Sequence, residues 1–207
     1  ELIAGELASA PIEIAVVGEF DMDAVIAAVA STFGNLPARK TELAPHEQRR
    51  MASFTNDRGE RVLTHAGAPD QALALTYWPT TDDDDAQEEA TLELLARILR
   101  LEMTDTIREQ LGASYSPTSG SSMSNIYDGY GTFSTSVIVE PSQASEVFGV
   151  VDQLAEKLRT APVDEDTLAR ARKPLLEQLA QAKKSNGWWL GVADDAQLEA
   201  DRLDRIR

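Results

Sequence analysis

Residues 107–124 read Ile-Arg-Glu-Gln-Leu-Gly-Ala-Ser-Tyr-Ser-Pro-Thr-Ser-Gly-Ser-Ser-Met-Ser, and the rest of the pattern is arranged around them. A long amphipathic segment runs into this stretch and ends at Gly112, and a run rich in hydroxyl groups follows. Arg108 and Tyr115 are the two side chains here that could take part in chemistry. Both also have structural interpretations, since a cation complements a helix C-terminus and tyrosine is common on half-buried strands.

The segment of residues 86–111 predicts the longest helix of the chain. Its apolar residues recur on one face, at Leu92, Leu95, Leu99, Met103, Ile107 and Leu111. Glu93 and Arg97 are spaced to pair on the outer side of this helix. Four aspartates at 82–85 precede it, and they lack the spaced ligands and the glycine of an EF-hand loop. Capping of the helix N-terminus is therefore a better interpretation than a calcium site.

Five segments have the composition of β-strands. They are the β-branched run 12–17, the pair 61–66 and 71–78 around a turn at 67–70, and the pair 113–123 and 131–140 around 125–129. The run 12–17 is apolar throughout, which predicts a buried strand. Pro79 is expected to end the strand that precedes it.

Further helices are predicted on both sides of this central region. Weak helical character covers residues 1–9, and Asp21 caps a helix that Gly34 closes. Pro141 opens another helix, and Asp164 caps a third that Pro174 should kink or break. A last helical stretch carries Trp188 and Trp189. Long one-sided helices beside paired strands predict an α+β fold, with helices packed on one face of a mainly antiparallel sheet.

Composition limits the function classes. A chain of 207 residues that is 43% hydrophobic is expected to form a single domain over residues 1–207. The first residue is Glu1 and not Met, and Arg207 falls inside a charged helical pattern, which suggests a piece of a larger protein. Thirty-five acidic against 19 basic residues give a net charge of −16, which disfavours nucleic acid and anionic membrane as partners. No apolar run approaches the roughly 20 residues of a membrane span. Without cysteine there is no thiolate nucleophile and no Cys-ligated metal.

Few residues could form a catalytic or metal site. The two histidines, His46 and His65, stand apart, and neither lies in an H-x-x-E-H or H-E-x-x-H run, so no metal site is expected in this chain. Gly18 follows an apolar run, but the repeated glycines of a nucleotide loop are absent. A Ser-His-Asp arrangement stays open, although the sequence has no G-x-S-x-G elbow.

The stretch from Arg108 to Ser116, placed after a long helix, resembles the C-terminal-half signature of the M16 zinc metallopeptidases, the pitrilysin and insulinase family. In that family an arginine and a tyrosine with six residues between them reach the catalytic chamber. Residues 16–21 and 33–37 resemble two further family blocks, in the same order. Residues 184–190 are similar to a segment of bacterial members. The resemblance covers nearly the whole chain.

The resemblance implies an enzyme built from two homologous halves that close on a peptide. Zinc would be held by an H-x-x-E-H helix and a distal glutamate in the N-terminal half, and no cofactor is expected in this chain. Tyr115 would donate a hydrogen bond to the substrate carbonyl at the scissile bond, and Arg108 would hold the peptide backbone. The expected partners are the N-terminal half, on the same chain or as a separate subunit, and a peptide substrate.

Two other functions stay open. One is a non-catalytic peptide-binding or scaffold homologue with the same fold, because the family contains inactive partner subunits. The other is a free-standing domain that binds a small ligand. If the chain is half of a peptidase, the isolated chain is expected to be inactive and free of metal. The resemblance leaves the compartment open between bacterial periplasm and cytoplasm and favours the periplasm.

Overall fold

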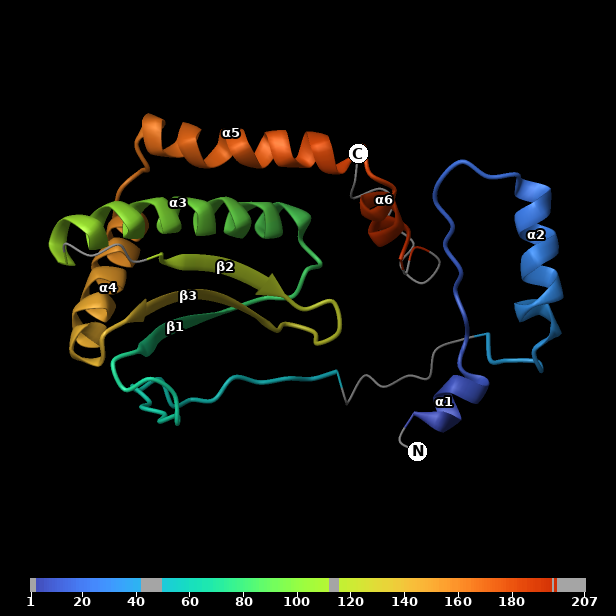
Figure 1. The fold of residues 1–207 in the computed structure, drawn as a ribbon, viewed down its shortest axis with the longest axis horizontal. Helices are drawn as coiled ribbons and strands as arrows, with labels where there is room; N and C mark the ends of the chain where they lie inside the picture. Colours follow the sequence, from blue (N-terminus) through green and yellow to red (C-terminus); the bar gives the residue numbers. More distant parts are fainter. Residues whose placement is uncertain (1–2, 42–49, 112–115, 195, 197–207) are drawn as a thin grey trace. The chain divides into compact units, whose positions relative to one another are not determined.

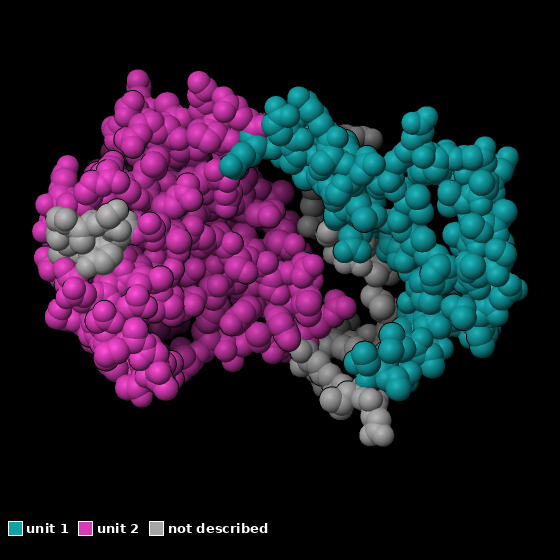
Figure 2. All heavy atoms as spheres, viewed as in Figure 1, with its two compact units in different colours: residues 1–46, 178–207 teal, residues 47–177 magenta. Residues whose placement is uncertain are grey.

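The computed structural model describes residues 3–41, 50–111, 116–194 and 196. By its internal contacts the chain divides into two compact units, coloured separately in Figure 2. The smaller unit comprises residues 1–46 and 178–207, and the larger comprises residues 47–177. The larger unit contains the sheet, the longest helix and the candidate residue Arg108.

The sheet of the larger unit has three antiparallel strands in the order β1-β3-β2 (Figure 1). They are β1 (Ala72–Thr80), β2 (Thr118–Met123) and β3 (Gly131–Val139). The predicted pairing of the last two strands is confirmed, and Gly129 in the turn between them has a φ of +65°, which favours glycine. The prediction that Pro79 ends β1 is wrong, because β1 lies at the sheet edge, where a missing N–H can be tolerated.

Helices α3 (Ala86–Leu111) and α4 (Ala144–Thr160) cover one face of this sheet, with α3 against β2 and α4 against β1 (Figure 1). The side chains that point inward from the strands and the two helices form one buried cluster. Its larger members are Leu99, Met103, Ile107, Phe133, Val137, Val147, Val151 and Leu154. Burial of these side chains is the main stabilising contribution in this unit. The predicted α+β fold is confirmed.

Helix α3 is buried on two sides, whereas its sequence pattern indicated one. Ile98 is only 4% exposed, yet it lies outside the cluster that faces the sheet. Leu101, one turn further along, borders a hollow together with residues of α5 (Glu165–Ala182). Helix α5 therefore lies along the side of α3 that carries Leu101, away from the side that packs on the sheet.

The starts of the later helices follow the predicted caps. Pro141 begins a short 3-10 turn that leads into α4, and the Asp164 carboxylate accepts a hydrogen bond of 2.9 Å from the Thr167 amide at the start of α5. Of the kink or break predicted at Pro174, the break is wrong, because α5 is continuous from Glu165 to Ala182. Proline removes one hydrogen bond, and the turns on both sides retain theirs.

The smaller unit contains α1 (Ala4–Ser9), α2 (Met22–Ser31), a 3-10 turn at Phe33–Asn35 and α6 (Asn186–Ala193). Asp21 caps α2 as predicted, accepting from the Ala24 amide at 2.8 Å. The prediction that Gly34 closes this helix is wrong: α2 ends at Ser31, where the Thr32 hydroxyl donates to the Ala28 carbonyl at 2.7 Å. Ser185 caps α6 by accepting from the Trp188 amide.

Two of the five predicted strands do not form in the part of the chain that the structure describes. Residues 12–17 have no ladder partner there, and neither do residues 61–66, in which Leu63 is 89% exposed. A β-branched run favours extended backbone, but a strand also needs hydrogen bonds from a neighbouring strand. Gln71 does donate its amide to the Ala68 carbonyl, so the turn predicted at 67–70 is present.

Candidate functional site

Arg108 lies on the last turn of α3, and its side chain is exposed. The preceding residue, Ile107, is 1% exposed and anchors this turn in the core. A cation at this position complements the partial negative charge of the helix C-terminus. No acid among the described residues forms an ion pair with Arg108. Its guanidinium can therefore offer a fork of donors to a ligand.

Tyr115 lies outside the described residues, as do Gly112, Ala113 and Ser114. The described flanks on either side are well anchored. Helix α3 extends to Leu111 before this gap, and Pro117 after it is buried. The hydroxyls of Thr118 and Ser136 then share a hydrogen bond of 2.6 Å at the start of β2. The geometry between Arg108 and Tyr115 therefore stays a prediction.

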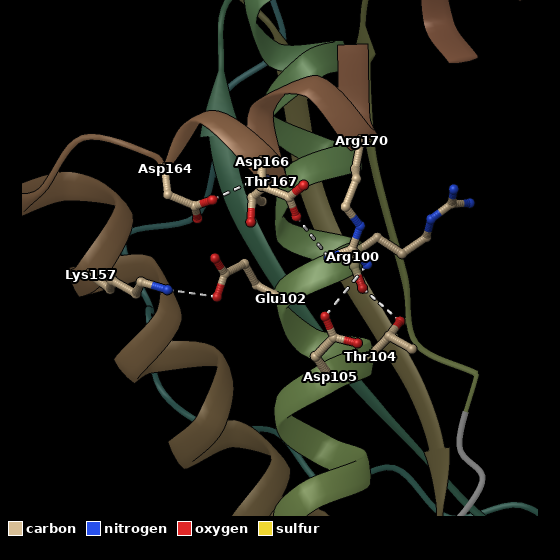
Figure 3. A network of polar contacts seen from close by, with 9 residues as sticks. All are labelled: Arg100, Glu102, Thr104, Asp105, Lys157, Asp164, Asp166, Thr167 and Arg170. Carbon is tan, nitrogen blue, oxygen red and sulfur yellow. Dashed lines mark hydrogen bonds and ion pairs between the residues drawn. The ribbon is translucent and has the colours of Figure 1, made fainter. Parts of the chain in front are cut away.

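A network of polar contacts holds α3 between its neighbouring helices (Figure 3). Lys157 of α4 donates to the Glu102 carboxylate of α3 at 2.7 Å, and the Glu102 side chain is only 14% exposed. Arg170 of α5 lies 3.7 Å from the Asp105 carboxylate. Exposed ion pairs contribute little to stability, so the partly buried Lys157–Glu102 pair matters more. The Lys157–Glu102 contact thus helps to hold the helix that presents Arg108, and sequence spacing gives no signal for either contact, since the partners lie far apart in the chain.

The Asp164 cap makes the start of α5 sensitive to pH. The hydrogen bond from the Thr167 amide lowers the pKa of Asp164 below its ordinary value of 3.8. A lowered folded pKa stabilises the fold above the ordinary pKa, and this contribution is lost as pH falls through the folded pKa. We expect wild type to unfold at a higher temperature than Asp164→Asn at pH about 6. The difference should shrink below pH about 3.8. A difference that stays constant in thermal melts down to pH about 2 would contradict the assignment.

The acidic run at 82–85 caps α3, as predicted. The Asp85 carboxylate accepts from the Gln87 amide at 2.8 Å and from the Glu88 amide at 3.2 Å. The Asp82 carboxylate accepts from the Gly129 amide in the turn between β2 and β3. Asp85 thus caps α3 and Asp82 holds the turn between β2 and β3, and these hydrogen bonds account for the two side chains without a bound cation.

The histidines do not form a catalytic or metal site in the part of the chain that the structure describes. His65 is exposed, and its Nδ1 accepts a hydrogen bond from the Gly67 amide at 2.8 Å. The predicted strand position of His65 is wrong, since residues 61–66 form no strand. No hydrogen bond joins it to a described serine. His46 lies outside the described residues. Among the described residues, no group of three or more His, Cys, Asp or Glu side chains could hold a metal ion.

The sequence model of the family described as "Peptidase M16 inactive domain" matches residues 8–175, which are 168 of the 207 residues. The chain belongs to this family. The M16 match includes both Arg108 and Tyr115 and residues of both compact units. The family resemblance found in the sequence is therefore confirmed.

Solved structures of two proteases and of a peptidase M16 inactive domain share this fold. The periplasmic protease PqqL from Escherichia coli is 14% identical, with a TM-score of 0.64 over 91% of this chain and 21% of that one. A protease from Helicobacter pylori is 15% identical, with a TM-score of 0.64 over 91% of this chain and 47% of that one. The peptidase M16 inactive domain from Pseudomonas fluorescens is 22% identical, with a TM-score of 0.50 over 65% and 33% of the two chains.

At these identities the likeness establishes the fold alone, and this M16 domain spans less than half the length of each of the three proteins. No curated protein matches the chain. Among the described helices, none is both long and apolar enough to cross a lipid bilayer. The role of Arg108 therefore has to be argued from its own chemistry and surroundings, because the shared fold does not determine it.

Proposed function

We propose that this M16 domain is the substrate-binding half of a zinc-dependent peptidase that hydrolyses peptide bonds. The observation that carries the proposal is the exposed Arg108 guanidinium. It is fixed at the end of a helix buried on two sides, has no acidic partner among the described residues, and lies within the matched family region. A structural cation at a helix end needs no such rigid support, whereas a group that positions a substrate does.

In this proposal the two candidate residues act on the peptide around the scissile bond. Arg108 holds backbone carbonyls beside that bond with its fork of N–H donors. The phenol of Tyr115 donates to the carbonyl oxygen on which negative charge develops. Zinc in the N-terminal half supplies an activated water as nucleophile. The 207-residue chain alone lacks that half of the chemistry and is inactive.

Removing the Arg108 side chain tests the proposal in the intact parent protein. Arg108→Ala should lower kcat/KM for peptide hydrolysis roughly 10- to 100-fold, the range expected for one lost charged hydrogen-bonding group. Arg108→Lys should fall between wild type and Arg108→Ala, because lysine keeps the charge and loses the planar fork. Steady-state kinetics on a fluorogenic peptide measures both variants.

Arg100→Ala is the matched control, since Arg100 is an exposed arginine two turns earlier on the same helix. Its kcat/KM should stay within about twofold of wild type. Equal losses in Arg100→Ala and Arg108→Ala would assign the effect to helix stability, and an unchanged rate in Arg108→Ala would remove its role in binding.

A non-catalytic peptide-binding or scaffold homologue is the second candidate, favoured by the word "inactive" in the family description. Zinc content of the intact parent protein separates the two. The peptidase needs an H-x-x-E-H segment and one equivalent of zinc in its N-terminal half or its partner subunit. Absence of both would leave the scaffold function.

Under either function we propose that residues 1–207 form one C-terminal-type domain. A periplasmic location is supported by the fold shared with a periplasmic protease.

A further inference from the structure

Asp105 is the acid best placed to pair with Arg108 within its own helix. Side chains three or four residues apart on a helix are neighbours, and within α3 those at this spacing from Arg108 are Thr104, Asp105 and Leu111. Asp105 alone among them carries a charge. Both Asp105 and Arg108 are exposed, so an ion pair between them would occupy the guanidinium that the proposed function assigns to the peptide.

Asp105 is instead engaged by a cation from another helix. The Nη2 atom of Arg170 on α5 lies 3.7 Å from Oδ2 of Asp105, and Figure 3 shows the two side chains turned toward each other. Both residues belong to the larger unit. The distance is longer than that of a hydrogen bond, so the attraction acts between the charges. Arg170 therefore competes with Arg108 for the Asp105 carboxylate.

Arg170 is itself held for this contact. Its Nη1 atom lies 3.8 Å from Oδ2 of Asp166, one turn earlier on α5, so two different nitrogens face two different carboxylates. A guanidinium keeps its charge and offers donors on several sides, which suits it to bridge two acids. One cation thus lies between an acid of α5 and the acid that neighbours Arg108.

We propose that Arg170 is a positioning residue, which holds Asp105 on the α5 side and so leaves the Arg108 guanidinium free for a peptide. The inference rests on the proposed function, in which Arg108 binds backbone carbonyls. An exposed pair at i, i+3 spacing is weak, so Asp105 released from Arg170 would occupy Arg108 for roughly half to two thirds of the time.

Removing the Arg170 charge in the intact parent protein tests this role. Arg170→Gln should raise KM for a fluorogenic peptide roughly twofold to threefold at low salt and leave kcat unchanged, because saturating peptide displaces the Asp105 carboxylate. Arg170→Lys keeps a cation beside Asp105 and should stay close to wild type. Arg172→Gln, at an exposed arginine two residues further along α5, is the matched control and should equal wild type.

The Asp105→Asn variant separates this role from a structural one. Neutral asparagine does not compete for Arg108, so Asp105→Asn should match wild type, and its combination with Arg170→Gln should return KM to the wild-type value. A pair that only held α5 against α3 would be broken equally by either single variant, and the double variant would recover nothing. Equal rises in KM in the two single variants would therefore overturn the proposal.

Chemical labelling of arginine gives a readout that does not need hydrolysis. Phenylglyoxal reacts with the neutral guanidine form, and a neighbouring carboxylate favours the protonated form and slows the reaction. Peptide mass spectrometry should show Arg108 labelled about twofold more slowly in Arg170→Gln than in wild type, and at the wild-type rate in the double variant. Arg100, an exposed arginine with no acid three or four residues away, is the internal reference.

Equal labelling rates for Arg108 in wild type and Arg170→Gln would also overturn the proposal, because Asp105 would then not reach Arg108. Unchanged hydrolysis in Arg108→Ala, with labelling rates that change as expected, would instead contradict the proposed function and support the competition for Asp105. The two failures are thus distinguishable.

Discussion

Under the proposed function, replacing Tyr115 by Phe in the intact parent protein should lower kcat for peptide hydrolysis by roughly 10²–10³, the effect of removing one donor to a developing oxyanion. Phenylalanine keeps the ring and removes the hydroxyl, so packing changes little while the hydrogen bond is lost. Loss of a donor that acts only on the transition state lowers kcat and kcat/KM equally and leaves KM unchanged. Steady-state kinetics at saturating and limiting peptide concentrations measures both quantities.

Tyr77→Phe is the matched control, because Tyr77 is an exposed tyrosine on β1. Its kcat should equal that of wild type. A kcat for Tyr115→Phe that also equals wild type would end the role assigned to the phenol. A rise in KM alone would turn Tyr115 into a ground-state binding group, which supports peptide binding without transition-state stabilisation.

Met103→Ala should lower the free energy of unfolding of the larger unit by about 2–5 kcal/mol. Met103 is 0% exposed and lies in the cluster between α3, the sheet and α4, so truncation removes apolar contacts and leaves a cavity. Urea unfolding followed by circular dichroism measures the change. Met51→Ala, at a methionine that is 77% exposed, should change the stability by no more than about 0.5 kcal/mol. Similar values for both variants would mean that the cluster is not the main core.

Features set by short-range chemistry could be predicted from the sequence. The N-caps at Asp21 and Asp164 depend on a side chain and an amide three residues on. The sheet-facing side of α3 and the pairing of β2 with β3 follow from hydrophobic periodicity and a turn that contains Gly129. In each case the information lies within a few residues or within a single helix.

Features set by distant partners could not be predicted. The run 12–17 has strand composition, but whether a strand forms depends on a neighbour that composition does not reveal. The ion pair between Arg170 of α5 and Asp105 of α3 joins two helices that lie far apart in the chain. The Lys157–Glu102 ion pair joins residues 55 positions apart. The helix break predicted at Pro174 did not occur for a different reason. A proline removes one hydrogen bond, and a helix supported at both ends can continue through it.

The candidate site also combines a feature that the sequence pattern predicts with one that it does not. The position of Arg108 follows from the helix pattern, and its exposure on an anchored turn agrees with it. Its pairing with Tyr115 was suggested by the family motif, since neither charge nor periodicity links the two residues.

The burial of α3 on two sides has a consequence for motion. A helix covered on one side can separate from its sheet in a local fluctuation, whereas α3 must break its contacts with the sheet, α4 and α5 together. Amides around Met103 can then exchange with solvent only when the larger unit opens as a whole. The turn that carries Arg108 belongs to the same cooperative segment through Ile107. The backbone from which the Arg108 side chain extends is thus held by the core, and under the proposed function adaptation to different peptides comes from that side chain or from the ligand.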